Sequence, residues 1–311
     1  MNIIGPDSLI FGVEDFDACV KYLQDYGLKR VDNGMSGATF EALDGTSIVV
    51  RKSGDGSLPP AFAPSPNIRE TVYGVADAAT LEAIGAELSK DRDVFRDPHG
   101  VLHSKDDSGI PIAFQITVRR KIATAPALIN CPGASMQRPL NDTGAVPGAP
   151  VLPRSLSHVV YFVPDAVRAE RFYRERLGFR VVDRFTDVGP FMRPAGTHEH
   201  HTLFLIQGGG PFLIGLNHFT FHLSGPNELL QAGWRFHHKG YKTFWGPGRH
   251  ILGSNYFWYF NSPFGGCMEY DADMDLHDDD WVPRAVEANA STSQIYLFDY
   301  KPLWSPNGDG H

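Results

Sequence analysis

Three side chains in the C-terminal half, His158, His218 and Glu269, combine the residue types that bind a redox-active metal. Each lies in or at the end of an apolar run typical of a strand, where alternate side chains share a face. Two imidazoles and one carboxylate are the ligand set of non-haem Fe(II) oxygenases, which leaves coordination positions open. A single buried histidine is as readily a hydrogen-bonded core residue, but three such groups together favour a metal. The sequence therefore predicts a site for Fe(II), with Mn(II) as the alternative.

The composition bounds the function classes. The chain has 311 residues, a hydrophobic fraction of 42%, a charged fraction of 21% and a net charge of −8. These fractions are typical of a globular protein, and the negative charge argues against nucleic acid or an anionic membrane as a partner. No apolar run approaches 18 residues, and the first residues lack the pattern of a signal peptide. Three widely separated cysteines fit a reducing compartment. We therefore expect a cytoplasmic protein.

A stretch rich in Pro, Gly and Ala, residues 122–153, separates two halves of similar length. Proline fixes φ and removes a hydrogen-bond donor, so a long helix or central strand is excluded there. The sequence predicts a surface linker flanked by an N-terminal domain at 1–121 and a C-terminal domain at 154–285. Residues 286–311 form a predicted tail, which we expect over the mouth of the pocket or at a subunit contact.

The two halves repeat one pattern. Each begins with a strand, continues with a helix that ends in Gly and then alternates short strands, and a second strand and helix follow. This predicts two β-α-β-β-β modules in each half. When the halves are overlaid, His158 corresponds to Ser8, His218 to about Glu70 and Glu269 to about Ala113. A complete ligand set is therefore predicted in the C-terminal half alone.

Residues 248–270, GRHILGSNYFWYFNSPFGGCMEY, resemble the signature of the type I extradiol ring-cleaving dioxygenases of the vicinal oxygen chelate superfamily. His250 precedes Glu269 by 19 residues and Tyr259 precedes it by 10, as in that signature. Residues 155–158, 199–203 and 216–218 resemble the family segments that carry the first ligand, a catalytic histidine and the second ligand. The resemblance extends motif by motif over about 155–270.

The resemblance implies an α+β fold with two tandem domains, each of two β-α-β-β-β modules that form a half-open mixed barrel around a cavity. It implies an Fe(II)-dependent enzyme that inserts both atoms of O2 into a substituted catechol beside the diol. His158, His218 and Glu269 are then the metal ligands. His201 is the acid–base residue, and His250 and Tyr259 hydrogen-bond the substrate oxygen. The implied partners are a catechol, O2 and further copies of the chain in a homo-oligomer.

The chain departs from the family pattern at Asn217, where a second histidine is common, and at residues 252–255, where Asn-Asp is common. These departures concern the ring pocket, and a substituted or carboxylated monocyclic catechol is the substrate we favour. Three alternatives remain open: a glyoxalase-like isomerase or epimerase, an aromatic dioxygenase acting on a 2-oxo acid, and a non-catalytic module that binds small molecules. The isomerase or epimerase alternative has no need of His201, His250 and Tyr259, the binding module predicts no metal ligand set, and chains of the 2-oxo-acid dioxygenases are usually longer.

Overall fold

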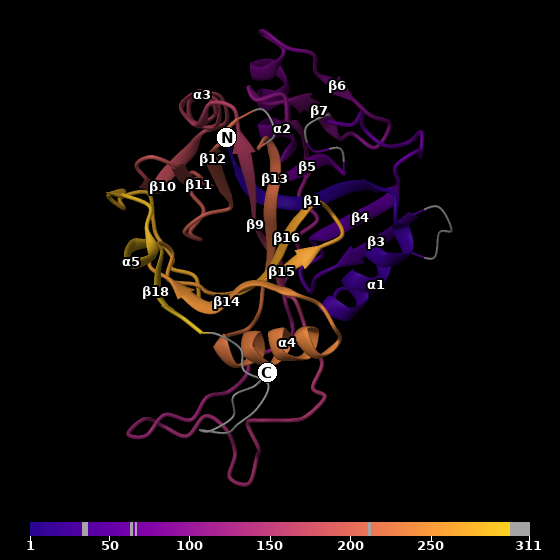
Figure 1. Ribbon diagram of the computed structural model, residues 1–311. Helices are drawn as coiled ribbons and strands as arrows, with labels where there is room; N and C mark the ends of the chain where they lie inside the picture. The colour runs from indigo at the N-terminus through magenta and orange to yellow at the C-terminus, as the bar shows by residue number, and fades with distance from the viewer. Residues whose placement is uncertain (33–36, 63–64, 66, 211–212, 299–311) are drawn as a thin grey trace.

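The computed structural model describes residues 1–32, 37–62, 65, 67–210 and 213–298. The first half forms an eight-stranded mixed sheet with the order β2-β3-β4-β1-β5-β8-β7-β6. Its elements, coloured indigo to purple in Figure 1, are β1 (Ile3–Val13), α1 (Phe16–Tyr26), β2 (Lys29–Arg30), β3 (Gly37–Glu41), β4 (Ser47–Lys52), β5 (Ile68–Val75), α2 (Ala78–Leu88), β6 (Phe95–Arg96), β7 (Leu102–Lys105) and β8 (Pro111–Ile116).

The second half forms a ten-stranded mixed sheet with the order β17-β10-β11-β12-β9-β13-β16-β15-β14-β18. Its elements are β9 (Ser155–Val163), α3 (Ala166–Arg171), a π-helical turn η1 (Phe172–Arg176), β10 (Phe179–Phe185), β11 (Gly189–Pro194), β12 (Leu203–Gln207), β13 (Gly215–His222), α4 (Pro226–His238), β14 (Thr243–His250), β15 (Tyr256–Ser262), β16 (Gly266–Ala272), β17 (Arg284–Val286), α5 (Ala290–Ser293) and β18 (Gln294–Leu297).

The strand order shows the predicted modules directly. In each module the first strand pairs in parallel with the last, as β1 does with β4 and β13 does with β16. Two modules join through antiparallel first strands, β1 with β5 and β9 with β13. Neither sheet closes on itself, since β2 and β6 are the edges of the first sheet and β17 and β18 those of the second. The predicted fold of two half-open, modular mixed sheets is therefore confirmed.

Helix α1 begins and ends where the sequence signals predict. In α1 the Asp15 side chain accepts a hydrogen bond from the backbone N–H of Ala18 at 3.0 Å, and Gly27 ends the helix with a φ of 117°. A left-handed residue at this position favours glycine because it has no Cβ. The helix buries Tyr22, Leu23 and Tyr26 on one face. Its last turn is thereby fixed against neighbouring strands.

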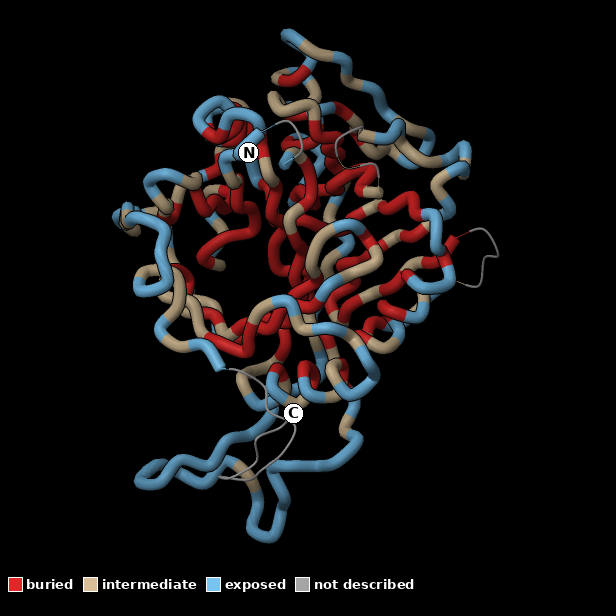
Figure 2. Tube along the Cα trace, in the orientation of Figure 1, coloured by how far each residue is buried: buried red, intermediate tan, exposed pale blue. Residues whose placement is uncertain are grey.

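One hydrophobic core runs through both halves. The buried cluster contains side chains of the first sheet, such as Leu9 and Phe11, together with side chains of the second, such as Phe219 and Met268. Figure 2 shows the buried trace passing through the centre of both sheets. The boundaries assigned to the individual domains stay a prediction, because the core does not divide between them.

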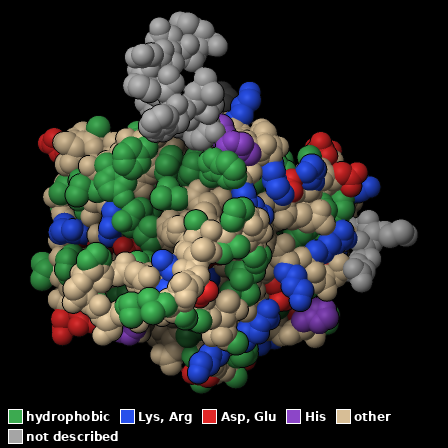
Figure 3. Space-filling view, turned by 90° about the horizontal axis from the view of Figure 1, so that it is seen from below, with side chains coloured by type: hydrophobic (Ala, Val, Ile, Leu, Met, Phe, Trp, Pro, Cys, Tyr) green, Lys and Arg blue, Asp and Glu red, His purple; other side chains and the backbone are tan. Residues whose placement is uncertain are grey.

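Most of the linker lies away from this core, although Val151 near its end belongs to it. Most of residues 122–150 are exposed and irregular, and Figure 1 shows them projecting below α4, although the prediction placed them against the surface. The face seen from below in Figure 3 carries exposed hydrophobic side chains. Within the linker, Ile129, Met136 and Leu140 are exposed. Among the described residues, no helix combines the length and apolarity that crossing a bilayer requires.

Candidate metal centre

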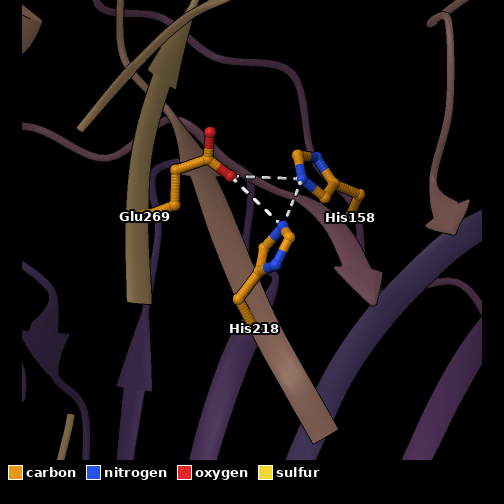
Figure 4. A group of neighbouring side chains, drawn as sticks. All are labelled: His158, His218 and Glu269. Atoms are coloured by element: carbon orange, nitrogen blue, oxygen red, sulfur yellow. Dashed lines mark hydrogen bonds and ion pairs between the residues drawn. The ribbon is translucent and has the colours of Figure 1, made fainter. Parts of the chain in front are cut away.

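The three predicted ligands lie side by side on adjacent central strands. His158 is on β9, His218 on β13 and Glu269 on β16, and Figure 4 shows their side chains converging on one point. His158 Nε2 lies 3.3 Å from His218 Nε2 and 3.3 Å from Glu269 Oε2, and His218 Nε2 lies 3.5 Å from Glu269 Oε2. Within the described part of the chain, no other group of three such residues is arranged in this way.

This spacing suits a single ion bound by all three donor atoms. Three donor atoms 3.3–3.5 Å apart surround a point about 2 Å from each, which is the usual distance from a metal to nitrogen or oxygen. The other carboxylate oxygen of Glu269 is buried and has no hydrogen-bond partner among the described residues. A buried carboxylate oxygen without a partner is costly, so the site fits a cation.

Neighbouring polar groups set the tautomers of both imidazoles. Asn217 Oδ1 accepts a hydrogen bond from His218 Nδ1 at 2.5 Å. Ser157 Oγ donates to Asp271 Oδ2 at 3.2 Å and lies 2.9 Å from His158 Nδ1, from which it accepts. With a proton on each Nδ1, both Nε2 lone pairs face Glu269. Such second hydrogen bonds orient histidine ligands and raise their basicity.

Burial keeps the imidazoles neutral. Desolvation lowers the pKa of His158 well below its usual range, and neighbouring imidazoles lower it further. Desolvation, with His250 nearby, lowers the pKa of His218 to about 3. Metal ligands must be deprotonated, so two neutral imidazoles at neutral pH are ready to bind. Desolvation followed by the charge of Asp271 raises the pKa of Glu269 well above its usual range. A bound cation would counter the desolvation and the charge of Asp271, the two causes that raise the pKa of Glu269.

The three residues predicted to act on substrate surround the same centre. The ring of His201 lies 4.2 Å from that of His158 and is buried. His250, at the end of β14, has its Nε2 3.3 Å from the hydroxyl of Tyr259 on β15. The Tyr259 ring meets the His218 ring edge-on at 5.0 Å. All of them line one cavity of about 280 Å³ together with His158 and His218.

The cavity wall is mostly apolar. It is formed by strands of both modules of the second half, which curve around it, and by Ser293 of α5. Its apolar lining side chains are Val160, Phe185, Phe191, Phe204, Ile206, Phe244, Trp245 and Leu252. Apolar walls with a few polar groups are typical of small-molecule sites. A second, more open cavity of about 620 Å³ lies near Arg193 and Trp281 and contains none of the predicted site residues.

Several residues that contact the site were not predicted from the sequence. Thr220 Oγ1 donates to Glu269 Oε2 at 2.5 Å and lies 3.1 Å from His158 Nε2. Ser293 contributes a backbone oxygen 3.3 Å from His250 Nδ1. The period of two in β13 places Thr220 on the face of His218, so this position was open to prediction. Nothing in the sequence indicates that Ser293, 43 residues beyond His250, returns to it.

His222 is not a ligand. It follows His218 by four residues on β13, but its Nδ1 lies 2.8 Å from Asp271 Oδ1 and its Nε2 lies 3.3 Å from Glu199 Oε1. Burial alone would lower the pKa of His222, but the carboxylates of Asp271 and Glu199 outweigh it and raise the pKa well above its usual range. His222 therefore forms a buried ion pair behind the centre.

In the first half the corresponding positions hold no ligand set. Ser8 Oγ accepts a hydrogen bond from Ser47 Oγ at 3.2 Å, and Glu70 pairs with His103 Nδ1 at 2.9 Å. Ala113 carries no polar group. His103 lies on β7. The first half instead contacts the strand of Glu269, since the Tyr26 hydroxyl donates to the Glu269 backbone oxygen at 2.5 Å.

Comparisons with known proteins agree with this architecture. A curated relative, metapyrocatechase 2 of Cupriavidus necator, is 38% identical over 154 residues, covering 49% of this chain and 46% of the relative. The match thus spans about half the length of that relative. Among solved structures, the Mn(II)-bound glyoxalase from Novosphingobium aromaticivorans has a TM-score of 0.72 at 21% identity and covers 94% of this chain and 90% of its own.

The 2,3-dioxygenase LapB from Pseudomonas sp. KL28 is as similar in fold, with a TM-score of 0.72 at 19% identity, covering 92% of this chain and 98% of that chain. Identities this low show a shared fold alone. The model of the Glyoxalase/Bleomycin resistance protein/Dioxygenase superfamily matches residues 155–269, which include every predicted ligand. Residues 155–269 thus match this superfamily, and the chain as a whole shares its fold with solved structures that include a 2,3-dioxygenase.

Proposed function

We propose that the chain is an extradiol ring-cleaving dioxygenase that uses Fe(II) to insert both atoms of O2 into a catechol beside its diol. The observation that carries this proposal is that the candidate metal ligands and the residues predicted to act on substrate lie together at one cavity. His158 and His218 line it with Glu269 beside them, and His201, His250 and Tyr259 line it too. The names of metapyrocatechase 2 and LapB support the same chemistry.

His158, His218 and Glu269 would hold the metal. Their donor set of two nitrogens and one oxygen suits Fe(II), and Mn(II) is the alternative that the neighbouring Mn(II)-bound glyoxalase raises. When bound, the metal would supply adjacent positions for the two catechol oxygens and O2 and a path for electrons between them. The tautomers set by Asn217 and Ser157 keep both imidazoles ready for it.

His201 would move the proton. Desolvation and the neighbouring His200 lower the pKa of His201 well below its usual range, so the ring is neutral at pH 7 and able to accept a proton from a substrate hydroxyl. Its place beside His158 puts it within reach of a substrate held at the centre. A histidine that accepts a proton can return it later to the product oxygen.

Tyr259 and His250 would orient the substrate. His250 Nδ1 donates to the Ser293 backbone oxygen, so its Nε2 accepts from the Tyr259 hydroxyl. Desolvation and the charge of Glu269 raise the pKa of Tyr259, which keeps this hydroxyl protonated. Desolvation lowers the pKa of His250 to about 4. When a deprotonated catechol oxygen enters the cavity, the Tyr259 hydroxyl would turn from His250 Nε2 and donate its one proton to that oxygen.

The cavity favours an uncharged substrate. Among its described lining residues there is no Lys or Arg that could pair with a carboxylate, and aromatic side chains such as Phe191 and Trp245 dominate the wall. A buried carboxylate without a partner is costly. The sequence favoured a substituted or carboxylated monocyclic catechol, and of these we therefore place a catechol with an apolar substituent first.

The test is anaerobic loading of the full chain with Fe(II), followed by O2 uptake with catechol, an alkylcatechol and a carboxylated catechol. We expect one O2 per catechol, both labelled oxygens of ¹⁸O2 in the ring-opened product, and the highest kcat/KM for the alkylcatechol. Glu269→Gln should lose bound iron and turnover, whereas His99→Gln, in a turn of the first half, should keep both. A loaded protein that leaves catechols intact and isomerises a glutathione hemithioacetal would establish the glyoxalase alternative instead.

A further inference from the structure

A second histidine lies directly behind His201. His200 Nδ1 is 2.9 Å from His201 Nδ1, and the two rings meet edge-on with centroids 5.1 Å apart. The His200 side chain is fully buried and lines no part of the substrate cavity. It therefore contacts the proposed acid–base residue without access to substrate.

The far side of His200 meets a carboxylate. His200 Nε2 lies 2.8 Å from Asp183 Oδ2, and Asp183 is fully buried on β10. The backbone N–H and the guanidinium of Arg284 also donate to Asp183, because β17 pairs with β10 at this position. Burial alone would raise the pKa of Asp183, but the hydrogen bonds from His200 and Arg284 outweigh it and lower the pKa to about 2.

The hydrogen bonds fix where each proton lies. An ionised carboxylate only accepts, so His200 carries its proton on Nε2. The Nδ1 of a neutral His200 is then an acceptor, and the proton between the two rings belongs to His201 Nδ1. A neutral His201 with its proton on Nδ1 has an unprotonated Nε2, the ring nitrogen that His200 does not contact.

We infer that Asp183 and His200 are positioning residues that hold His201 in the tautomer whose free Nε2 accepts the substrate proton. The inference rests on the function proposed above for His201. As His201 gains the proton on Nε2, the Nδ1 proton stays on the hydrogen bond to His200, and the Asp183 carboxylate stabilises the new positive charge through the His200 ring. A buried carboxylate has this tautomer-fixing role in other enzymes that use histidine as a base.

Backbone contacts around His200 hold its ring in place beside His201. The His200 N–H donates to the Asp275 oxygen at 2.9 Å, and the Asp275 N–H donates to the Gly253 oxygen at 2.8 Å. A Cβ at Gly253 would lie 3.0 Å from His200 Nδ1, and Gly253 has a φ of 85°. The glycine thus allows this loop to close against the His200 ring, in the segment where the chain departs from the family's Asn-Asp pair.

The first test reads the tautomer without turnover. In the full chain labelled with ¹⁵N-histidine and loaded with diamagnetic Zn²⁺, long-range ¹H–¹⁵N correlation spectra distinguish a protonated from an unprotonated ring nitrogen. We expect His201 to be protonated on Nδ1 and not on Nε2 at pH 7. In His200→Phe, which keeps a ring and removes its nitrogens, and in Asp183→Asn, which removes the charge, we expect His201 to shift toward the Nε2-protonated form.

The second test measures kinetics. His200→Phe and Asp183→Asn should lower kcat at least about tenfold, which is part of the 10²–10⁴ that acid–base catalysis contributes, with KM and bound iron unchanged. His277→Phe is the matched control, since the His277 ring packs 5.6 Å from that of His200 and no hydrogen bond joins them. It should keep both the tautomer and kcat.

The outcomes separate this inference from the proposed function. An Nε2-protonated His201 in the unmodified chain, or His200→Phe and Asp183→Asn proteins that keep tautomer and kcat, would overturn the inference. The unmodified chain and Asp183→Asn still decide if His200→Phe does not fold. A chain with the expected tautomer that leaves every catechol intact would instead refute the dioxygenase proposal.

Discussion

Thr220 shows how one hydroxyl supports the proposed metal centre. It donates to Glu269 Oε2 and lies 3.1 Å from His158 Nε2, so it fixes the carboxylate against the imidazole. Thr220→Val keeps the shape and removes the donor. We expect metal affinity to fall about 10- to 100-fold, the range found for lost outer hydrogen bonds. Competition with a chromophoric chelator measures it, and Thr220→Ser should retain the affinity. Equal affinities for the Val and Ser variants would contradict this role.

At the residue scale, sequence predicts ligands better than it predicts their partners. His158 and His218 lie in the first strands of the two modules of the second half, and Glu269 lies in the last strand of one of them. Their types and spacing were enough to expect them together. The pair Asp183 and His200 was not predicted, because it depends on strand pairing that brings residues 17 positions apart into contact. A residue that acts through another has no sequence signature of its own.

Helix α1 of the first half carries the contact that fixes β16 of the second. The Tyr26 ring stacks on Tyr270 with centroids 4.0 Å apart, and the Tyr270 hydroxyl donates to the Tyr26 oxygen at 2.8 Å. Tyr26 in turn donates to the backbone of Glu269. The first half lacks a ligand set, yet this helix positions the strand that bears a proposed ligand.

Two tyrosines of α1 offer a matched pair of changes. Tyr26→Phe removes the donor to Glu269, so we expect a loss of about 1–2 kcal/mol in unfolding free energy and weaker metal binding. Tyr22→Phe removes a buried hydroxyl that has no hydrogen-bond partner in the described residues. We expect its stability to match the parent within about 0.5 kcal/mol. Urea unfolding and metal titration compare the two, and similar losses for both would show that burial of the rings alone matters.

The helices and the module strands could be predicted because caps, glycines and alternation are local signals. The edge strands β17 and β18 could not be, since each is short and partly exposed and forms only by pairing with β10 or β14. Within the predicted tail, Ser293 lines the cavity. Its remaining residues, 299–311, lie outside the described residues.

At the scale of the whole molecule, the halves act as one body because polar contacts join them inside a shared core. Thr71 and Tyr161 share a hydrogen bond at 2.6 Å, and the Leu156 N–H donates to Thr46 Oγ1 at 2.7 Å. The phenyl rings of Phe11 and Phe219 lie 5.4 Å apart. Internal repetition predicts two similar halves, but it carries no information on how they face each other. These contacts therefore had to come from the structure.

One buried contact between the halves should make stability depend on pH. Asp106 accepts from the N–H groups of Ser108 and Ile110 and from the Tyr173 hydroxyl of the other half, yet desolvation outweighs these bonds and raises its pKa to about 6. The folded chain thus binds a proton more tightly than the unfolded chain, whose Asp has its usual pKa near 3.9. Stability contributed by this group is lost as pH rises from about 4 to 6. Asp106→Asn should gain up to about 3 kcal/mol over the parent across that window. Urea unfolding at several pH values measures this gain.

Asp55→Asn is the contrasting control, because the Ser57 N–H lowers the pKa of that exposed carboxyl. The pH dependence of the stability that Asp55 contributes therefore has the opposite sign. A difference between Asp106→Asn and the parent that stays constant from pH 4 to 7 would refute a buried, proton-binding Asp106.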